Sequence, residues 1–423
     1  TGQGPMRRTI FMLTLILAGE AIFGLPFHTA RFFRPTFLEV FGFSNTQLGD
    51  VFAVYGVTAM LAYFPGGALA DRFSARTLMT VSLFSTAMGG LYMAAFPGGL
   101  QLALLYGYWG ITTIFLFWAA MIRATREWGG ALSQGTAFGI LDGGRGLVAA
   151  AVAVVAVAVL DLYMPLDATL ATAAQRRDGF RAVVLLYSGV TLAAGVLAWF
   201  LIPKSRGREE VRRERPLTGM ATVIRRPVVW AQAAVIVCAY CAYKGLDNYS
   251  LYAVEVLGMD EVEGARFTAY ASYVRPVAAV AAGFIADRFR ASKTIGISFL
   301  TLTASYGVLA VAAATTSWLW IIYANIFVSF FAVFGLRGVY FALLQETRTP
   351  RHLTGTTVGM VSFVGFTPEV FFGSIAGRIL DHSPGIEGHQ HYFAFLAAIA
   401  LLGLFVVAWL MWLNRSNFSC SWT

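Results

Sequence analysis

Apolar runs of about twenty residues recur along the whole length of this 423-residue sequence. A helix rises about 1.5 Å per residue, so one such run can span a bilayer core of about 30 Å. The composition agrees, because 13% charged residues is far too little for the surface of a soluble domain of this length. We therefore expect an all-α integral membrane protein with twelve transmembrane helices, beginning near Thr9, Thr46, Thr77, Gln101, Gln134, Arg181, Pro227, Gly264, Thr294, Ser317, Thr354 and Tyr392.

The basic residues predict the orientation of these helices. Arg7 and Arg8 precede the first run, and the longest connection, residues 204–226, holds eight Lys and Arg residues. Because cytoplasmic loops carry the excess of Lys and Arg, we expect both termini in the cytoplasm. The first run contains Glu20 and lacks a small-residue cleavage site, so it is expected to be a helix and not a signal peptide. Five basic residues depart from the rule by lying on the outer side: Arg31, Arg34, Arg176, Arg177 and Arg181.

The net charge of +9 follows from this topology, because basic loops face anionic lipid. No motif for nucleic-acid binding is present. Arg31 and Arg34 can attract an anion at an outer vestibule, or reach the lipid headgroups; the second is the favoured alternative.

A nine-residue segment occurs twice, which indicates that the chain consists of two copies of one bundle. Residues 67–75 read GALADRFSA, and residues 283–291 read GFIADRFRA. Each copy ends one apolar run and begins the next. Such repeats are typical of transporters built from two related halves. We predict an N-terminal six-helix bundle at residues 1–203, a cytoplasmic basic linker at 204–226 and a C-terminal six-helix bundle at 227–423.

Twelve spans in two halves, a basic central loop and G-x-x-x-D-R at both loops resemble the major facilitator superfamily. The resemblance implies two pseudo-symmetric six-helix bundles that work by alternating access. It also implies a cytoplasmic conformational gate, in which the glycines permit close helix contact and the charged residues form contacts that break during transport; the alternative is that these residues only cap helices. The gate residues would be Gly67, Asp71, Arg72, Arg76, Gly283, Asp287 and Arg288.

The first copy departs from the family pattern, with Ser74 and Ala75 where Gly and a basic residue are common. Three further segments are similar to the YihN-like bacterial inner-membrane carriers: residues 138–146 (FGILDGGRG), 337–341 (RGVYF) and 380–386 (LDHSPGI). This likeness implies a location in the bacterial inner (plasma) membrane.

Eight ionisable residues fall near the middle of the predicted spans. A charge there costs roughly 2.5–3.5 kcal/mol on insertion scales, so each side chain should face a partner or a cavity. Asp142 and Arg145 are three residues apart, as are Lys244 and Asp247, so each pair can share a helix face. Such a bridge is either static or exchanged during transport. The others are Glu20, Arg275, Arg337 and Glu369.

Arginine suits anion binding, because its planar guanidinium group can donate two hydrogen bonds to a carboxylate or phosphate and stays charged. We expect substrate contacts from Arg145, Lys244, Arg275, Arg337, Tyr240 and Tyr243. A buried carboxylate suits proton coupling, because burial and nearby cations shift its affinity for a proton in opposite directions. The proton-coupling candidates are Glu20, Glu369, Asp142 and Asp247, with Glu20 and Glu369 favoured because neither has a basic residue within a turn. Pro276, directly after Arg275, predicts a local helix distortion.

These features favour a secondary active transporter, expected to be a monomer, that moves a small polar, anionic metabolite with protons or a counter-substrate. The alternative is a carrier that exports amphipathic compounds in exchange for protons. No catalytic constellation, metal motif or phosphate-binding loop stands out, so we expect neither an enzyme nor a cofactor nor a bound metal.

Overall fold

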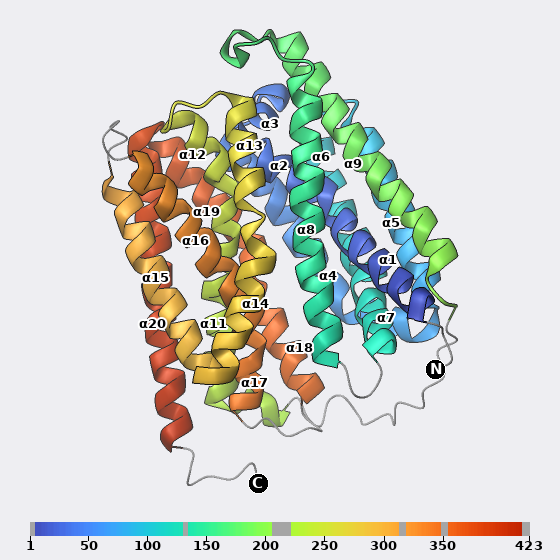
Figure 1. The fold of residues 1–423 in the computed structure, drawn as a ribbon, viewed down its shortest axis with the longest axis vertical. Helices are drawn as coiled ribbons and strands as arrows, with labels where there is room; N and C mark the ends of the chain where they lie inside the picture. The colour runs from blue at the N-terminus through green and yellow to red at the C-terminus, as the bar shows by residue number, and fades with distance from the viewer. Residues whose placement is uncertain (1–4, 130–133, 205–220, 313–318, 348–353, 417–423) are drawn as a thin grey trace. The chain divides into compact units, whose positions relative to one another are not determined.

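The computed structural model describes residues 5–129, 134–204, 221–312, 319–347 and 354–416 (Figure 1). The regular structure in these ranges is helical, as the apolar runs predict. Its elements are α1 (Pro5–Phe23), η1 (Gly24–His28), α2 (Thr29–Phe32), α3 (Arg34–Phe41), α4 (Asn45–Arg72), α5 (Ala75–Met93), α6 (Gly99–Gly110), η2 (Ile111–Trp118), α7 (Ala119–Gly129), α8 (Gln134–Asp161), η3 (Ala168–Leu170), α9 (Ala173–Leu201), α11 (Pro227–Gly245), η4 (Leu246–Asn248), α12 (Tyr249–Glu255), α13 (Glu261–Ala271), α14 (Val274–Phe289), α15 (Ala291–Val311), α16 (Leu319–Val339), η6 (Tyr340–Ala342), α17 (Leu343–Glu346), α18 (Thr354–Gly365), α19 (Pro368–His382) and α20 (Ile386–Ser416).

Each of the twelve expected spans coincides with one helix or with consecutive helical segments. Among the described residues, ten helices are long and apolar enough to cross a membrane. The remaining two expected spans are α4 and α5. The all-α transmembrane prediction is therefore confirmed.

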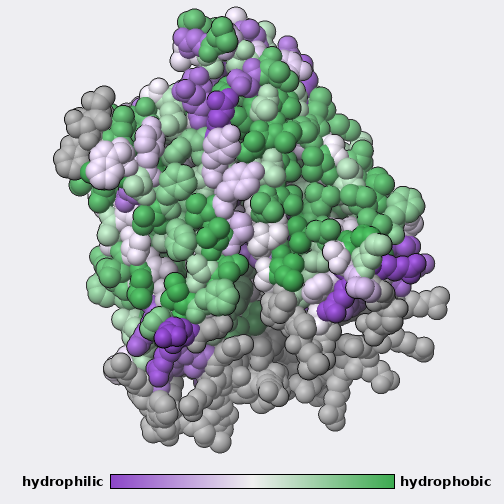
Figure 2. All heavy atoms as spheres, viewed as in Figure 1, coloured by the Kyte–Doolittle hydropathy of each residue, from purple (hydrophilic) through white to green (hydrophobic). Residues whose placement is uncertain are grey.

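The chain divides into two compact units. Unit 1 comprises residues 1–208, 247–276 and 373–381, and unit 2 comprises residues 209–246, 277–372 and 382–423. In unit 1, hydrophobic side chains cover the visible faces of α8 and α9, and hydrophilic side chains gather near the helix ends (Figure 2). This distribution is the one expected of helices that cross a bilayer.

The first span of unit 1 is not a uniform α-helix. Pro26 has no backbone N–H and cannot complete the α-helical hydrogen-bond pattern. The chain widens there into the π-helix η1, and the backbone N–H of Thr29 donates to the carbonyl of Gly24, five residues earlier. A π-helical segment turns less per residue than an α-helix, so it changes which side chains share a face.

Local capping explains why α4 and α9 begin where they do. Ser44 caps α4 in a reciprocal pair with Gln47, and Thr172 caps α9 in the same way with Gln175. Each pair satisfies backbone donors that the first helical turn leaves unpaired. These N-terminal caps fix where α4 and α9 begin.

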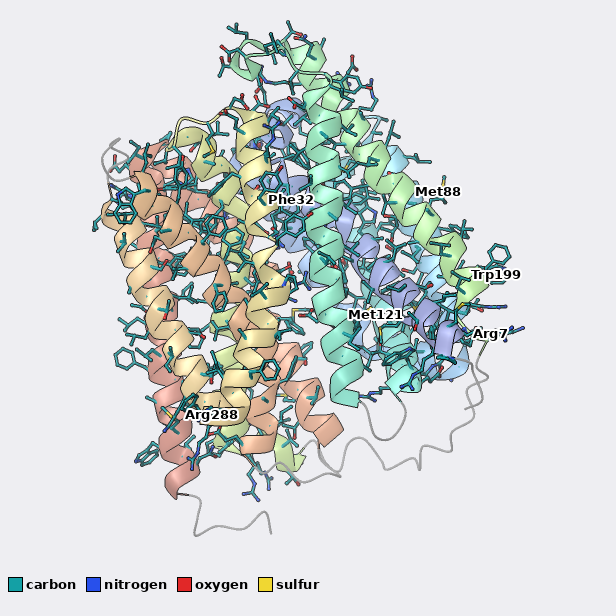
Figure 3. All side chains as sticks on the ribbon, in the orientation of Figure 1. Arg7, Phe32, Met88, Met121, Trp199 and Arg288 are labelled. Atoms are coloured by element: carbon teal, nitrogen blue, oxygen red, sulfur yellow. The ribbon has the colours of Figure 1, made fainter. Side chains whose placement is uncertain are left out.

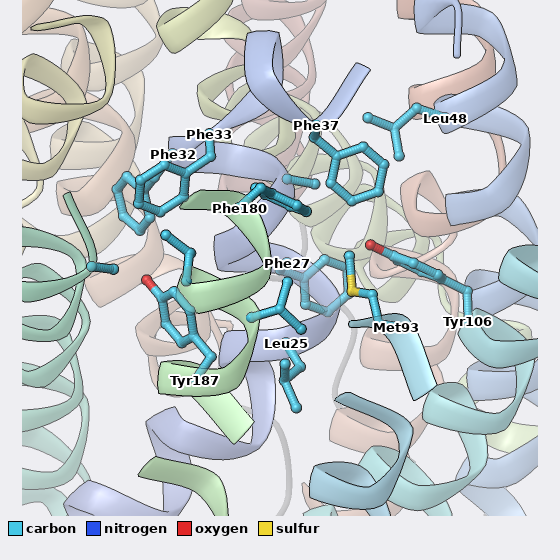
Figure 4. Close-up of a cluster of buried hydrophobic side chains, with 14 of the residues drawn as sticks. Leu25, Phe27, Phe32, Phe33, Phe37, Leu48, Met93, Tyr106, Phe180 and Tyr187 are labelled. Carbon is cyan, nitrogen blue, oxygen red and sulfur yellow. The ribbon is translucent and has the colours of Figure 1, made fainter. Parts of the chain in front are cut away.

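An aromatic core holds the bent first span in place (Figure 4). Phe37 of α3 packs edge-to-face on Phe180 of α9, with 5.6 Å between ring centroids. Leu25 and Phe27 of η1 lie in the same cluster of buried side chains. Packing of this kind, more than the hydrophobic effect, holds helices together in lipid.

One end of unit 1 is basic. Figure 3 places Arg7, at the start of α1, and Trp199, near the end of α9, at the same end of the unit. The Arg76 guanidinium lies over the Trp199 ring, 4.7 Å from its centroid. This is the end that the basic residues predict to be cytoplasmic.

Candidate functional site

A buried group of charged side chains lies inside unit 1. We call it the Glu20 cluster; its members are Glu20 of α1, His28 of η1, Asp142 and Arg145 of α8, and Arg275 of α14. Glu20, His28, Arg145 and Arg275 are each less than a tenth exposed. Buried charges in a membrane protein need partners, and this cluster supplies them.

Glu20 accepts hydrogen bonds on both carboxylate oxygens. Arg145 Nε lies 3.0 Å from Oε2, and Arg275 Nη1 lies 3.3 Å from Oε1. His28 Nε2 also lies 3.3 Å from Oε1. Arg275 reaches further with Nη2, which donates to Asp142 Oδ1 at 2.9 Å. Two guanidinium groups from different helices therefore converge on one carboxylate.

Glycines make room for these arginines. A Cβ on Gly146 would lie 2.8 Å from Arg275 Cδ, and a Cβ on Gly19 would lie 3.2 Å from Arg145 Cδ. The Cβ on Gly19 would also lie 2.8 Å from the sulfur of Met121, a residue labelled in Figure 3. Each guanidinium stem lies directly against the backbone of a neighbouring helix. The glycine-rich segment around Arg145 therefore seats a side chain from another span.

The predicted distortion at Pro276 is present. Helix α13 ends at Ala271 and α14 begins at Val274, so the eighth span is interrupted just before Arg275. The backbone N–H of Arg275 donates to the carbonyl of Ser272 at 3.1 Å, a bond that spans three residues in place of four. The break sets where the Arg275 side chain leaves the helix.

Asp142 and Arg145 contact partners other than each other. Arg145 contacts Glu20, and Asp142 contacts Arg275, so both reach other helices. In the second spacing pair, Asp247 accepts from Arg31 Nε at 2.6 Å and Lys244 Nζ lies 3.4 Å from Glu369 Oε2, while the pairing of Lys244 with Asp247 stays a prediction. Spacing of three residues allows a contact along one helix, but partners on facing helices are available as well.

Glu20 and Glu369 are favoured as proton carriers because no basic residue is near them in sequence, but basic residues contact both of them in the structure. Neither has a basic residue within a turn, yet Glu20 contacts Arg145 and Arg275, and Glu369 contacts Lys244. Their role in proton coupling stays a prediction.

Four of the five basic residues expected on the outer side contact acidic or polar side chains within unit 1: Arg31, Arg34, Arg176 and Arg181, the last through Asp178 at 2.9 Å. The expectation that Arg31 and Arg34 reach the lipid headgroups was wrong, because they are 8% and 2% exposed. Arg31 contacts Asp247, and Arg34 Nε donates to Asn45 Oδ1 at 3.0 Å. Arg176 Nε donates to Glu261 Oε1 at 2.6 Å. Acidic and polar partners therefore balance or hydrogen-bond these arginines, whichever side of the membrane they face.

A second charged group lies in unit 2. We call it the Lys244 cluster; it contains Tyr240, Tyr243 and Lys244 of α11, Arg337 of α16 and Glu369 of α19. The Tyr240 hydroxyl donates to Glu369 Oε1. The Arg337 guanidinium lies over the Tyr243 ring, 3.8 Å from its centroid, in a cation–π contact. Tyr240 also packs edge-to-face on Phe366, with 5.0 Å between centroids.

The repeated loops are described in part. The side chains of Asp71 and Asp287 lie outside the described residues. Arg72 and Arg288 are exposed. A Cβ on either Gly67 or Gly283 would meet nothing within 4 Å among the described residues, and the close helix contact expected at these glycines stays a prediction. The gate role of these loops stays a prediction.

Arg123 of α7 contacts the end of α4 at the first repeated loop, a contact that the sequence analysis did not predict. Its guanidinium donates to the carbonyl of Ala70 and, at 2.7 Å, to the carbonyl of Phe73. Both carbonyls lie at the C-terminal end of α4, where a positive charge is favoured by the helix dipole. Its position one or two turns before the end of a span was the available signal.

Comparison with known proteins gives consistent matches. Residues 9–371 match the Major Facilitator Superfamily. The inner membrane protein YqcE of Escherichia coli is 27% identical over 95% of this chain and 93% of its own. The inner membrane protein YihN of the same organism is 26% identical over 93% of this chain and 92% of its own. Among solved structures, a bacterial homologue of the human lysosomal transporter Spinster covers 100% of both chains, with a TM-score of 0.74 and 13% identity.

Proposed function

The chain belongs to the Major Facilitator Superfamily, and we propose that it carries a small anionic metabolite across the bacterial inner membrane by alternating access. Transport would be driven by protons or by exchange for a counter-substrate. Relatives named as inner membrane proteins support the location. The basic loops support cytoplasmic termini.

The observation that carries the anion proposal is the convergence of Arg145 and Arg275 on Glu20. Two guanidinium groups form a binding geometry that fits a carboxylate or phosphate. In this structure the Glu20 carboxylate accepts from these two guanidinium groups. A substrate anion would compete with Glu20 for the same donors, so that binding exchanges an internal ion pair for one with the substrate.

The Lys244 cluster supports a second binding contribution. It combines two cationic groups, Lys244 and Arg337, with the phenol rings of Tyr240 and Tyr243. A tyrosine offers an apolar face and a hydroxyl, which suits a polar organic molecule.

The aromatic part of that cluster also favours the alternative function. Tyr240 packs against Tyr243 and Phe366, with ring centroids 5.7 and 5.0 Å apart. An exporter of amphipathic compounds would use such rings to bind apolar surface. The two functions differ in which ligands bind and in whether the arginines matter.

A thermal-shift screen of the purified protein tests the proposal. The ligands are organic acids, sugar phosphates, sugars and lipophilic cations. A ligand at a hundred times its Kd adds about 2.7 kcal/mol to the apparent stability. We expect an anion to stabilise the wild type and to lose this effect in Arg275→Gln and Arg337→Gln.

The matched control is Arg266→Gln, which removes an exposed arginine that pairs with Asp161 at 2.9 Å. It should keep the full anion effect. Stabilisation by lipophilic cations that persists in Arg275→Gln would reject the anion proposal in favour of export of amphipathic compounds.

A further inference from the structure

His28 is a buried member of the Glu20 cluster, and no spacing pattern in the sequence points to it. Histidine is the side chain whose ordinary charge change falls between pH 5 and 8. The π-helix η1 places it at the end of a segment that starts four residues after Glu20. The lower turn per residue brings the imidazole to the Glu20 carboxylate, with 3.3 Å between Nε2 and Oε1.

His28 and Arg275 share one oxygen of Glu20. Both Nε2 of His28 and Nη1 of Arg275 lie 3.3 Å from Oε1, while Arg145 Nε bonds the other oxygen at 3.0 Å. A change in the charge of the imidazole therefore acts directly on the Arg275 contact. A protonated imidazole makes the stronger, charge-assisted bond to Oε1 and competes with Nη1 for it.

The cluster is balanced in charge when the imidazole is neutral. The carboxylates of Glu20 and Asp142 balance the guanidinium groups of Arg145 and Arg275. A proton on His28 adds one positive charge that no carboxylate in the cluster balances. A buried charge without a counter-charge is costly, so the protonated cluster favours entry of one negative charge.

Several elements contribute titratable or charged groups near His28. Arg31 follows on α2 and is already paired with Asp247. The Tyr187 ring of α9 lies edge-on, with 6.1 Å between centroids. The titratable and charged groups around the imidazole are Glu20 of α1, Arg31 of α2, Asp142 and Arg145 of α8, Tyr187 of α9 and Arg275 of α14.

We propose that His28 carries the coupling proton, and that one proton enters the Glu20 cluster with each negative charge of the substrate. Glu20 stays ionised as the acceptor for Arg145, His28 and Arg275. Protonation of His28 draws Glu20 Oε1 toward the imidazolium and turns Arg275 Nη1 toward the anion. This inference rests on the proposed anion transport.

The test is ¹⁵N NMR of the purified full-length protein with labelled histidine, from pH 5 to 8. The His28 signal is the one missing in His28→Gln. His389→Gln, at another buried histidine, is the matched control. A variant with His352, His382, His389 and His391 all changed to Gln assigns the signal in protein that keeps His28. The probe anions are nitrate, phosphate and malate, and their binding is scored separately by thermal shift.

We expect the His28 signal to change from neutral imidazole to imidazolium within this range. An anion that stabilises the protein should raise the midpoint, and a rise of one pH unit corresponds to about tenfold tighter binding to the protonated form. A signal that does not titrate, with or without anions, overturns the proposal.

Two further outcomes separate this proposal from the anion proposal. A probe that stabilises the protein but leaves the His28 midpoint unchanged overturns the coupling and leaves anion transport standing. A titrating His28 with no stabilising effect from any probe, and stabilisation by lipophilic cations, overturns anion transport and with it the coupling.

Discussion

Arg290, in the second copy of the repeated loop, adopts a backbone conformation that disfavours its side chain. Its φ is 86° and its ψ is 139°, a combination that glycine adopts far more readily than other residues. Strain of this kind costs about 1–3 kcal/mol. In the family pattern a glycine is common at this position. We therefore expect Arg290→Gly to raise the melting temperature. The net gain in the free energy of unfolding should be about 1 kcal/mol, after the entropy cost of glycine is subtracted.

Ser74 is the matched control, because it holds the same place in the first copy. Its φ is −66°, and its side chain accepts a hydrogen bond from the backbone N–H of Thr77. Replacing this cap with glycine removes the side-chain bond without relieving strain, so Ser74→Gly should not stabilise the protein. Equal or lower stability in Arg290→Gly would show that its backbone is not strained.

Arg145 allows a direct choice between the partner suggested by spacing and the partner in the fold. Its Nε lies 3.0 Å from Glu20 Oε2, with both side chains buried. Residues in contact couple by about 0.5–3 kcal/mol in a double-mutant cycle. We expect a cycle with Arg145→Gln and Glu20→Gln, followed by denaturation, to give a coupling of at least about 1 kcal/mol, which lies within that range.

The same cycle with Asp142→Asn in place of Glu20→Gln is the comparison. Asp142 contacts Arg275, and its side chain is 38% exposed, so solvent weakens its interactions. A larger coupling with Asp142 than with Glu20 would contradict the cross-helix pairing.

At the scale of helices, the start of α4 and the middle of α19 meet backbone to backbone within unit 1. A Cβ on Gly49 would lie 2.2 Å from the carbonyl oxygen of Gly373, and a Cβ on Gly377 would lie 2.4 Å from that of Asn45. Asp381 strengthens the contact by accepting the backbone N–H of Thr46 at 2.7 Å. An acidic side chain at a helix N-terminus is favoured by the helix dipole.

Gly49→Ala should therefore force the two helices apart and destabilise this conformation by about 1–3 kcal/mol, as other overpacking changes do. Gly139→Ala in α8 is the control, because a Cβ there meets nothing within 4 Å. That change should be neutral or stabilising, since alanine favours a helix over glycine. Both are measured by thermal unfolding, and similar losses in the two variants would argue against the close contact.

The positions of the helices could be predicted from the sequence, but the contacts between charged residues on different helices could not. The apolar runs that gave α8 and α9 are local features, and a repeated loop sequence reveals the duplication without any contact information. Glu20 and Arg275, by contrast, are 255 residues apart, and nothing near either one indicates the other. The widening of the first span at Pro26 also escaped prediction, although it decides that His28 faces Glu20. Sequence spacing found most of the charged residues, but it paired Asp142 with Arg145 along one helix, whereas their partners Arg275 and Glu20 come from other helices.

For the whole molecule, the basic loops predict which end of each helix faces the cytoplasm, and cysteine labelling tests it. Met6, at the start of α1, and Leu166, between α8 and α9, are both well exposed. Cys238 and Cys241 are buried, so single cysteines can be introduced in a Cys420→Ser background. In intact cells, a membrane-impermeant maleimide should label Leu166→Cys fully and Met6→Cys only at background level.

Permeabilising the cells should bring Met6→Cys to full labelling, which controls for its reactivity. The physical reason is the bias of Lys and Arg toward the cytoplasmic side, which Arg7 and Arg8 share with the linker at residues 204–226. Labelling of Met6→Cys in intact cells would place the N-terminus outside. The arginines at the other end, including Arg31 and Arg176, would then be the cytoplasmic ones, and their pairing with Asp247 and Glu261 would no longer be needed to explain their position.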